Sequence, residues 1–145
     1  MIDNLDRKIL NELIRNARIS YRELAKLVNL TDVAVIKRVK RLENQRIIKK
    51  YTTIVNPATL GYNVISYTGI NVAPEKLFNV IKALKEKEYI KYMAITSGDH
   101  DIFVVIWASS TSELEKIHEE IRNLDGVIAV YPMILSEIIK DDIYI

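Results

Sequence analysis

The hydrophobic period of the chain changes once, near residue 47, and this change constrains the fold more than any other feature of the sequence. Before it, apolar residues recur at the spacing of amphipathic helices. After it come runs of β-branched and aromatic residues, separated by turn signals and by two further helical patterns. The sequence therefore predicts an α+β protein with a helical N-terminal part and a sheet-forming C-terminal part.

The N-terminal part begins with a helix that carries Leu5, Ile9 and Leu13 on one face. Asp3 or Asp6 is available as its cap, and we expect the helix to end near Asn16.

Two more helices are predicted from their caps. Ser20 and Glu23 have the spacing of a capping box, which predicts a short helix over residues 21–28. Asn29 follows, and asparagine tolerates the left-handed backbone that a sharp turn between helices requires. Thr31 is then the expected cap of a third helix. Its buried face is predicted to hold Val35, Val39 and Leu42.

The C-terminal part is predicted to have the order βαββαβ of a ferredoxin-like domain, preceded by a linking strand. Either Ser110 or Ser112 can cap the second helix of this unit. We expect the domain boundaries 1–46 for the helices, 47–62 for the linking strand and hinge, and 63–145 for the ferredoxin-like domain. The expected elements are a linking strand over 47–55, a strand over 64–72, a helix from Pro74, strands over 89–96 and 102–107, a helix containing Leu114 and Ile121, and a strand over 127–135.

The composition excludes several classes of protein. With 145 residues, 49% of them hydrophobic, the chain is long enough to bury a core but too short for a large multidomain enzyme. It has no cysteine, which removes disulfides, thiolate nucleophiles and cysteine-ligated metal sites. It has no apolar run long enough for a membrane span and no signal-peptide pattern at its start. We expect a soluble, cytoplasmic protein without a membrane partner, a metal or a resident cofactor.

Charge is distributed unevenly along the chain. Residues 1–50 contain 13 Lys and Arg against 6 Asp and Glu, whereas residues 51–145 contain 8 against 13. Cations that displace the counterions of phosphates gain affinity for nucleic acid. The basic helical part is therefore a candidate for binding double-stranded DNA, although runs of charge often only solvate a helix.

The third helix has the position of the recognition helix in a helix-turn-helix, which enters the major groove. If Val35 faces the core, Val33 and Lys37 face outward near the first turn, with Ala34 beside them. We expect these three to read bases, since valine can contact a thymine methyl group and lysine can donate to guanine. Each lysine taken alone can equally be a solvated surface charge. Thr31 at the start of the helix, and Arg38, Lys40, Arg41, Lys49 and Lys50 as phosphate contacts, complete the predicted DNA-binding set.

The order βαββαβ places both helices on one face of the sheet and leaves the other face open. The strand over 102–107 is apolar without alternation, as if both of its faces were covered. A second copy of the chain is the simplest cover, which predicts a two-fold dimer. The alternative is a monomer with a modestly apolar surface.

The ordered set of motifs resembles the Lrp/AsnC (leucine-responsive regulatory protein, feast/famine) family of transcription regulators over nearly the whole chain. In the C-terminal half the resemblance includes Gly98–Asp101, similar to the family's Gly-Asp-aromatic-Asp turn, and Leu124–Val127 before the last strand. In the N-terminal half the similar stretches are Leu5–Leu10, Arg18–Ala25, Leu30–Thr31, Arg38–Glu43, Ile47–Tyr51 and Asn56–Gly61.

The resemblance implies a dimer, often assembled into octamers, that binds an amino acid or a related metabolite between dimers near the glycine turn. Four positions depart from the family pattern. Asn29 and Gln45 stand where glycine is usual, His100 replaces a tyrosine, and Pro132 occupies a position where some members have threonine. These last two departures leave the identity of the effector open.

The turn over 97–101 is the predicted effector site. Glycine-exposed N–H groups suit a carboxylate and acidic side chains suit an ammonium group, as an α-amino acid requires. An ordinary hairpin turn would have the same residues. The predicted effector-binding set is Ser97, Gly98, Asp99, His100, Asp101 and Pro132.

A search for catalytic motifs finds none, and we predict no catalytic residue. His118 stands among charged residues and is expected to be exposed. Two alternatives stay open. One is an enzyme that resembles the haem-pathway decarboxylases, which share this two-part architecture and bind a tetrapyrrole such as sirohaem. The other is an architectural DNA-binding protein without an effector.

Overall fold

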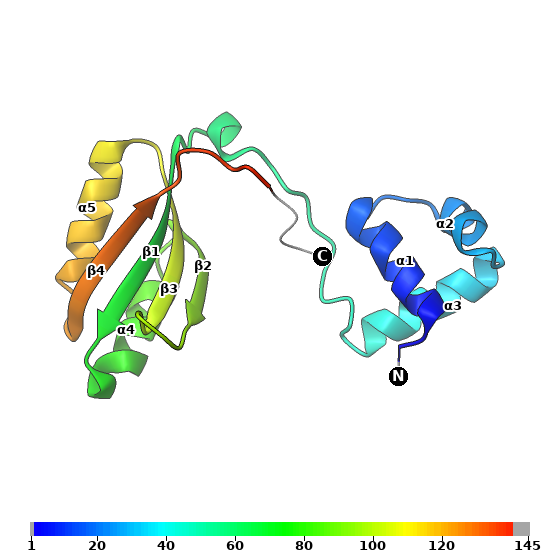
Figure 1. The fold of residues 1–145 in the computed structure, drawn as a ribbon, viewed down its shortest axis with the longest axis horizontal. Helices are drawn as coiled ribbons and strands as arrows, with labels where there is room; N and C mark the ends of the chain where they lie inside the picture. The colour runs from blue at the N-terminus through cyan, green and yellow to red at the C-terminus, as the bar shows by residue number, and fades with distance from the viewer. Residues whose placement is uncertain (1, 141–145) are drawn as a thin grey trace. The chain divides into compact units, whose positions relative to one another are not determined.

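The computed structural model describes residues 2–140, which form two compact units, residues 2–54 and Val55–Ile139 (Figure 1). Each unit has its own buried apolar cluster. Within the described part of the chain, no helix has the length and apolar character that crossing a membrane requires.

The N-terminal unit contains three helices, α1 (Asn4–Arg15), α2 (Tyr21–Val28) and α3 (Asp32–Asn44). Their starts confirm the predicted caps. The Asp3 carboxylate accepts the N–H of Asp6, and Ser20 does the same for Glu23 in a capping box. The helices pack around one core that consists of Ile9, Leu13, Leu24, Ala25, Val28, Val35, Val39 and Leu42.

Two residues of this unit have a left-handed backbone. Asn29 ends α2 with φ 54° and ψ 49°, as the sequence predicted. After α3 the left-handed residue is Arg46, with φ 56°. Gln45, which stands where the family commonly has glycine, has an ordinary φ of −79°.

The linking strand predicted over 47–55 does not form in the structure. Residues 49–56 have neither helix nor strand hydrogen bonds, and a 3-10 helix, η1 (Pro57–Leu60), follows. The β-branched composition favoured a strand, but a strand also needs a neighbouring strand to complete its ladder. No strand of the described chain lies beside this segment.

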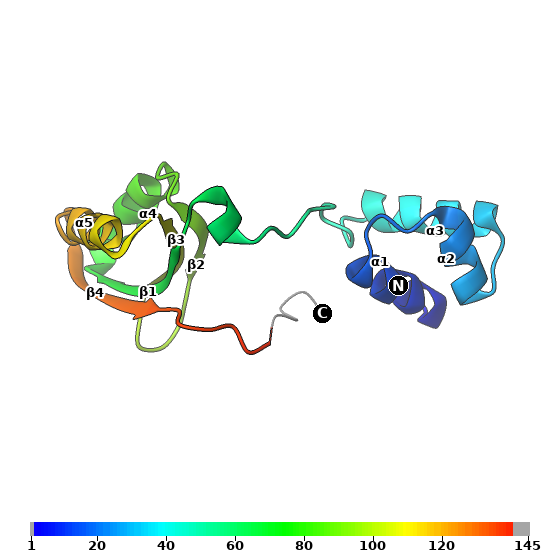
Figure 2. The ribbon, with the colours of Figure 1, turned by 90° about the horizontal axis from the view of Figure 1, so that it is seen from above.

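The C-terminal unit is a four-stranded antiparallel sheet in the order β2-β3-β1-β4, which is the ferredoxin-like arrangement. Figure 2 shows both of its long helices on the same side of the sheet. Its elements are β1 (Val64–Val72), η2 (Pro74–Lys76), α4 (Leu77–Lys85), β2 (Ile90–Ile95), β3 (Ile102–Ala108), α5 (Thr111–Arg122) and β4 (Val127–Ile134).

The two faces of the sheet differ in burial. Along β3, residues alternate between full burial under the helices and partial exposure on the other side. Ile102, Val104 and Ile106 lie in the core, whereas Phe103 and Val105 are only half-buried. The strand thus alternates in burial although it does not alternate in residue type, because the residues on both of its faces are apolar. The face away from the helices is called the open face below.

Candidate nucleic-acid interface and ligand-binding sites

The outer face of α3 is the candidate DNA-reading surface. Val33 is 61% exposed, and Lys37 and Lys40 are exposed on the same side of the helix, while Ala34 is half-buried. The opposite side of α3 is fully packed in the core. Thr31 is exposed and its hydroxyl accepts the N–H of Ala34 at 3.2 Å, which fixes the first turn of the helix.

Two arginines of the predicted DNA-binding set are already paired with carboxylates of α1 and its cap. Arg38 Nη1 donates to Asp3 Oδ2 at 2.6 Å and to Asp6 Oδ1 at 2.8 Å. Arg41 Nη2 donates to Asp6 Oδ2 at 2.5 Å. Asp6 is fully buried, so both guanidinium groups neutralise it. The structure therefore gives Arg38 and Arg41 a role in joining α3 to α1, which sequence reasoning did not foresee.

The Arg38 hydrogen bond lowers the pKa of Asp3 from its ordinary value to about 2, and the backbone N–H of Asp6 lowers it further. The same carboxylates raise the pKa of Arg38. Both shifts favour the charged forms of Asp3 and Arg38.

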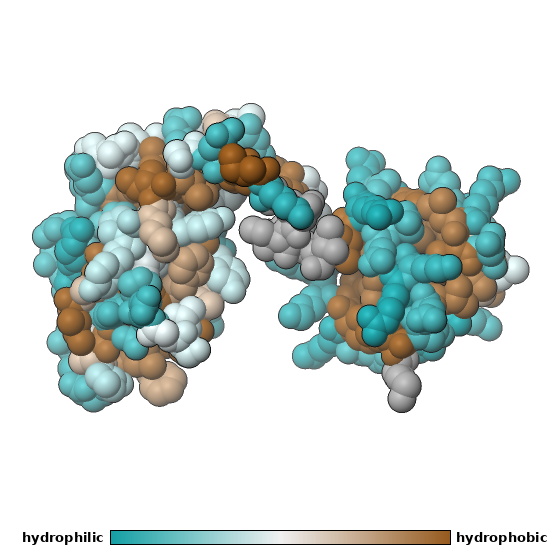
Figure 3. All heavy atoms as spheres, in the orientation of Figure 1, coloured by the Kyte–Doolittle hydropathy of each residue, from teal (hydrophilic) through white to brown (hydrophobic). Residues whose placement is uncertain are grey.

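Lys49 and Lys50 lie beyond the end of α3, in the segment that has no regular structure. Both side chains are exposed. Together with Lys37 and Lys40 they are the free cations of the predicted set, since no carboxylate of the described chain holds them. Figure 3 shows hydrophilic side chains over much of the N-terminal unit on the face drawn.

The predicted effector turn joins β2 to β3 and is tied down at its base. The Asp101 carboxylate accepts the N–H of Val72 at 2.8 Å, and the Thr96 hydroxyl donates to the carbonyl of His100 at 2.6 Å. Gly98 has φ 133°, a conformation that glycine adopts without strain. Asp99 is exposed and has no protein partner in the described residues.

These contacts divide the predicted turn residues by role. One oxygen of the Asp101 carboxylate, Oδ2, accepts from the backbone of β1, while the residue itself is exposed. Ser97, Gly98 and Asp99 are exposed at the tip. His100 packs on the open face: its ring lies 4.8 Å from the Tyr131 ring, and Nδ1 is 3.1 Å from Asn71 Oδ1.

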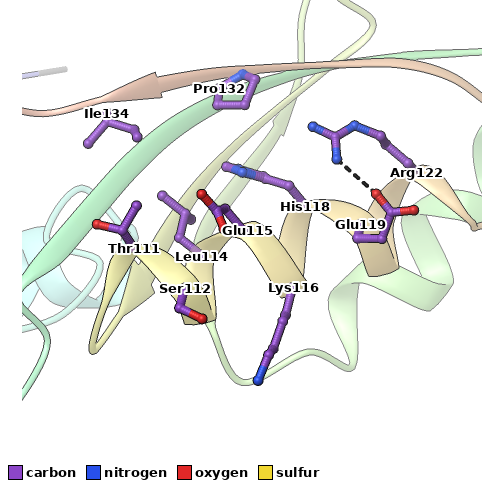
Figure 4. A pocket seen from close by; sticks show the side chains of 10 residues that line it. All are labelled: Thr111, Ser112, Leu114, Glu115, Lys116, His118, Glu119, Arg122, Pro132 and Ile134. Atoms are coloured by element: carbon purple, nitrogen blue, oxygen red, sulfur yellow. Dashed lines mark hydrogen bonds and ion pairs between the residues drawn. The ribbon is translucent and has the colours of Figure 1, made fainter.

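Pro132 does not lie with the turn. It pairs with Thr68 in the register of β1 and β4 and faces the helices, whereas His100 lies on the open face. Within one chain Pro132 and the His100 ring therefore lie on opposite faces of the sheet, and the predicted contact of Pro132 with the effector stays a prediction. Pro132 instead lines a groove of about 510 Å³ between α5 and β4, here called the α5–β4 groove (Figure 4).

His118 also lines the α5–β4 groove, and the expectation that it is exposed was wrong. Its side chain is 4% exposed and its Nε2 lies 3.0 Å from Thr68 Oγ1. Thr68 in turn lies 2.9 Å from the hydroxyl of Ser66. The sequence held a signal for this burial, because His118 is four residues after Leu114 and three before Ile121, within the apolar stripe of α5.

Two family models match the chain. A model described as the AsnC-type helix-turn-helix domain matches residues 2–43. A model described as the Lrp/AsnC ligand binding domain matches residues 66–145.

Relatives and solved structures agree with these matches. The HTH-type transcriptional regulator LrpA of Pyrococcus abyssi is 43% identical over 141 residues, which are 97% of this chain and 100% of the relative. The structure of E. coli AsnC has a TM-score of 0.89 at 27% identity, covering 97% of this chain and 96% of that one. A complex of the Neisseria meningitidis transcriptional regulator NMB0573 with L-methionine has the same fold, with a TM-score of 0.91 at 18% identity and coverage of 97% and 94%.

Proposed function

The chain belongs to the Lrp/AsnC family of transcription regulators, and from this premise we propose that it binds specific DNA sequences and changes that binding in response to an amino acid or a related metabolite. It is a transcription regulator with a helix-turn-helix and a ligand-binding domain. We propose the sequence specificity of DNA binding, the class of effector, and the residues that contact DNA and the effector.

One observation supports DNA reading most strongly: α3 buries one full face and presents Val33 and Lys37 on the other. A side chain reads a base only if the helix that bears it is held rigidly, and α3 is fixed by the core and by the Asp6 ion pairs. Val33, Ala34 and Lys37 are proposed to contact bases. Thr31, Lys40 and Lys49 are proposed to contact phosphates.

Arg38 and Arg41 have a smaller part in this proposal than the sequence suggested. Each guanidinium has five donors and uses only some of them on carboxylates. To contact a phosphate without releasing α3 from α1, each guanidinium must use a donor that the carboxylates leave free. We therefore assign them first to positioning α3 and second to the DNA backbone.

The effector is proposed to be a small molecule with a carboxylate, bound in the C-terminal unit in the cytoplasm. The exposed N–H groups at Ser97 and Gly98 and the free Asp99 carboxylate support a contact at the turn. The complex of the similarly folded regulator NMB0573 with L-methionine is consistent with an amino acid.

A second copy of the chain is proposed to cover the open face, and the family implies that such dimers assemble further. The open face bears Tyr67, Phe103, Tyr92 and Tyr131, whose rings contact one another or are exposed. Aromatic residues on a surface favour protein interfaces. A dimer would carry two α3 helices to the two halves of a palindromic site.

The function is tested by selecting duplexes from a random library with the purified full chain and measuring their binding by fluorescence anisotropy. We expect a selected duplex to bind at least about a thousandfold more tightly than a scrambled duplex of the same composition at physiological salt. We also expect the affinity to change when L-methionine or L-leucine is added. Equal affinity for both duplexes would indicate an architectural protein instead of a regulator with defined sites.

A further inference from the structure

The ring of His100 lies in a slot on the open face, here called the Gly69 slot. Gly69 is its floor, because a Cβ at this residue would lie 2.6 Å from Nε2 of the His100 ring and closer still to Cγ and Cδ2. Tyr131, which pairs with Gly69 across β1 and β4, forms one wall, and its ring centre lies 4.8 Å from that of His100. Non-bonded carbon atoms pack at about 3.5–4.0 Å, so any side chain at residue 69 would exclude the ring.

Neither the backbone nor the strand explains a glycine at residue 69. Gly69 is not one of the glycines with a positive φ, which are Gly61, Gly98 and Gly126. It lies inside β1, where glycine is less stable than alanine because it has no side chain to pack. The contact with the His100 ring is therefore the feature of the described structure that requires glycine here.

Asn71 holds the other end of the His100 ring. Its Oδ1 lies 3.1 Å from Nδ1 of the ring. An amide oxygen can only accept, so Nδ1 bears the hydrogen and donates it. Asn71 and Gly69 are two residues apart in β1 and thus lie on the same face of the sheet. The ring consequently lies along β1, over residues 69 and 71, with Tyr131 beside it.

The backbone next to His100 is bonded to the same stretch of β1. The N–H of Asp101 donates to the carbonyl of Ile70 at 3.1 Å, and the Asp101 carboxylate accepts the N–H of Val72 at 2.8 Å. Thr96 closes the base of the turn, because its N–H donates to the Asp101 carbonyl at 3.0 Å. Residues 69–72 therefore hold the turn through both backbone and side chains. Figure 2 shows the loop between β2 and β3 on the side of the sheet away from the two long helices.

These attachments act on different parts of the turn, whose exposed tip is residues 97–99. The Asp101 bonds fix where the turn returns to β3, whereas the His100 side chain fixes the residue that directly follows the tip. If the ring leaves the slot, residue 100 has to change its rotamer or its backbone. The His100 carbonyl accepts the Thr96 hydroxyl at 2.6 Å, so this change reaches the residue before the tip as well. Displacing the ring therefore disturbs both ends of the tip.

We propose that Gly69 is a positioning residue for the 97–101 turn: by leaving room for the His100 ring, it sets the conformation in which Ser97, Gly98 and Asp99 are presented. Gly69 acts through His100 and not by contacting an effector. This inference rests on the proposed function only for its consequence, which is that residue 69 determines how strongly an effector bound at the tip acts on DNA binding. The positioning itself is measured without an effector.

The first measurement is urea unfolding of the full chain in a double-mutant cycle. Gly69→Ala should lower the midpoint, because the Cβ excludes the ring. In the His100→Ala background the same substitution should leave the midpoint unchanged or raise it, because the slot is empty and alanine suits a strand better than glycine. Gly61→Ala is the matched control, since Gly61 has φ 87° and a Cβ there meets no described atom within 4 Å beyond its chain neighbours. The strain of Gly61→Ala should lower the midpoint equally in both backgrounds.

Hydrogen exchange of the turn separates positioning from a loss of stability alone. The amides of Thr96 and Asp101 are bonded within the turn and to β1, and they should exchange faster in Gly69→Ala than in wild type. His100→Ala should show the same increase, and adding Gly69→Ala to it should change nothing further. Gly61→Ala should leave both amides at the wild-type rate.

The consequence for the proposed function is measured with L-leucine and L-methionine as probes, added to the full chain on a selected duplex. The probe concentration that gives half of the change in DNA binding should rise at least about tenfold in Gly69→Ala and change less than about twofold in Gly61→Ala.

Two results would overturn the proposal. One is an equal loss of midpoint for Gly69→Ala with and without the His100 ring, and the other is turn amides that exchange at the wild-type rate in Gly69→Ala. If the turn behaves as expected but neither probe changes DNA binding of wild type, the positioning stands and the proposed effector response fails. If wild type and Gly69→Ala respond at the same probe concentration, the response stands and the positioning of the tip fails.

Discussion

At the scale of single residues, Asp3 and Asp6 determine how many basic side chains of α3 are available to DNA. Their carboxylates hold Arg38 and Arg41 across more than thirty positions of sequence. Sequence reasoning counted both arginines as phosphate contacts, because helical spacing tells which side of α3 they occupy but not what lies opposite. The ion pairs between α1 and α3 are tertiary contacts, which the helical spacing within α3 does not predict.

Asp6→Asn should destabilise the N-terminal unit strongly. The substitution leaves Arg38 and Arg41 next to a buried neutral amide, and removing one partner of a buried ion pair costs about 3 kcal/mol at the lower end of its range. We choose the lower end because both arginines keep part of their surface in water. Urea unfolding of the full chain, followed by circular dichroism, measures the change in the free energy of unfolding.

Asp3→Asn is the control for this prediction. Asparagine caps a helix as well as aspartate does, and the Asp3 side chain is 51% exposed, so the loss should be much smaller than that of Asp6→Asn. Losses of the same size in both variants would contradict the special role assigned to the buried carboxylate.

The pH dependence of stability should contain a contribution from Asp3. Its pKa is lowered to about 2 in the folded chain by the Arg38 hydrogen bond, so the folded state binds a proton less readily than the unfolded state. The stabilisation is therefore present above the unfolded pKa, near 4, and is lost as the pH falls through about 2. Urea midpoints between pH 5 and pH 2 should fall less steeply in Asp3→Asn than in wild type. Parallel curves would show that Asp3 does not contribute.

At the scale of elements, the sequence predicted correctly the features that depend on neighbouring residues, namely the helix caps and the turn between helices. The caps at Ser20 and Thr31 and the turn at Asn29 were correct, since each depends on residues within three or four positions. The prediction of a strand over 47–55 was wrong, because a strand forms only where a neighbouring strand can complete its hydrogen bonds. The face of the sheet on which Pro132 lies follows from the register of β4 with β1, which the sequence of β4 alone does not fix.

The left-handed turn after α2 gives a prediction for that element. Asn29→Ala should lower the free energy of unfolding by about 1 kcal/mol, since alanine keeps a Cβ in this left-handed conformation but lacks the short polar side chain that makes asparagine tolerant of it. Asn29→Gly should be neutral or slightly stabilising. Thermal or urea unfolding of the two variants checks the order. A less stable glycine variant would mean that the asparagine side chain itself contributes to the turn.

At the scale of the whole molecule, the basic helices and the acidic sheet domain are separate compact units that divide between Ile54 and Val55, several residues after the change of hydrophobic period near residue 47. The order of the sheet and the placement of both helices on one face followed from the sequence as well. What covers the open face did not follow from the sequence. A single chain indicates a neighbour only through the apolar residues that stay on its surface.

Val105→Lys should dissociate the proposed dimer. Val105 lies half-buried on the open face of β3, where a lysine would place an unpaired charge between two sheets. Phe78→Lys is the control, because Phe78 is 77% exposed on α4, away from that face. Sedimentation velocity should show a dimer or larger assembly for wild type and Phe78→Lys, and a folded monomer for Val105→Lys. An unchanged assembly in Val105→Lys would place the interface elsewhere.

The central claim is that α3 reads bases while neighbouring cations hold the phosphates, and one measurement tests it most directly. Binding of a selected and a scrambled duplex is compared across a salt series for Lys37→Ala, Lys49→Ala and the control Lys82→Ala on α4. The account predicts that Lys37→Ala loses about 1–3 kcal/mol of discrimination between the two duplexes, and that Lys49→Ala weakens both alike and lowers the salt slope by about 1. Lys82→Ala should change neither. Equal losses on both duplexes for Lys37→Ala, or unchanged binding in that variant, would contradict the claim.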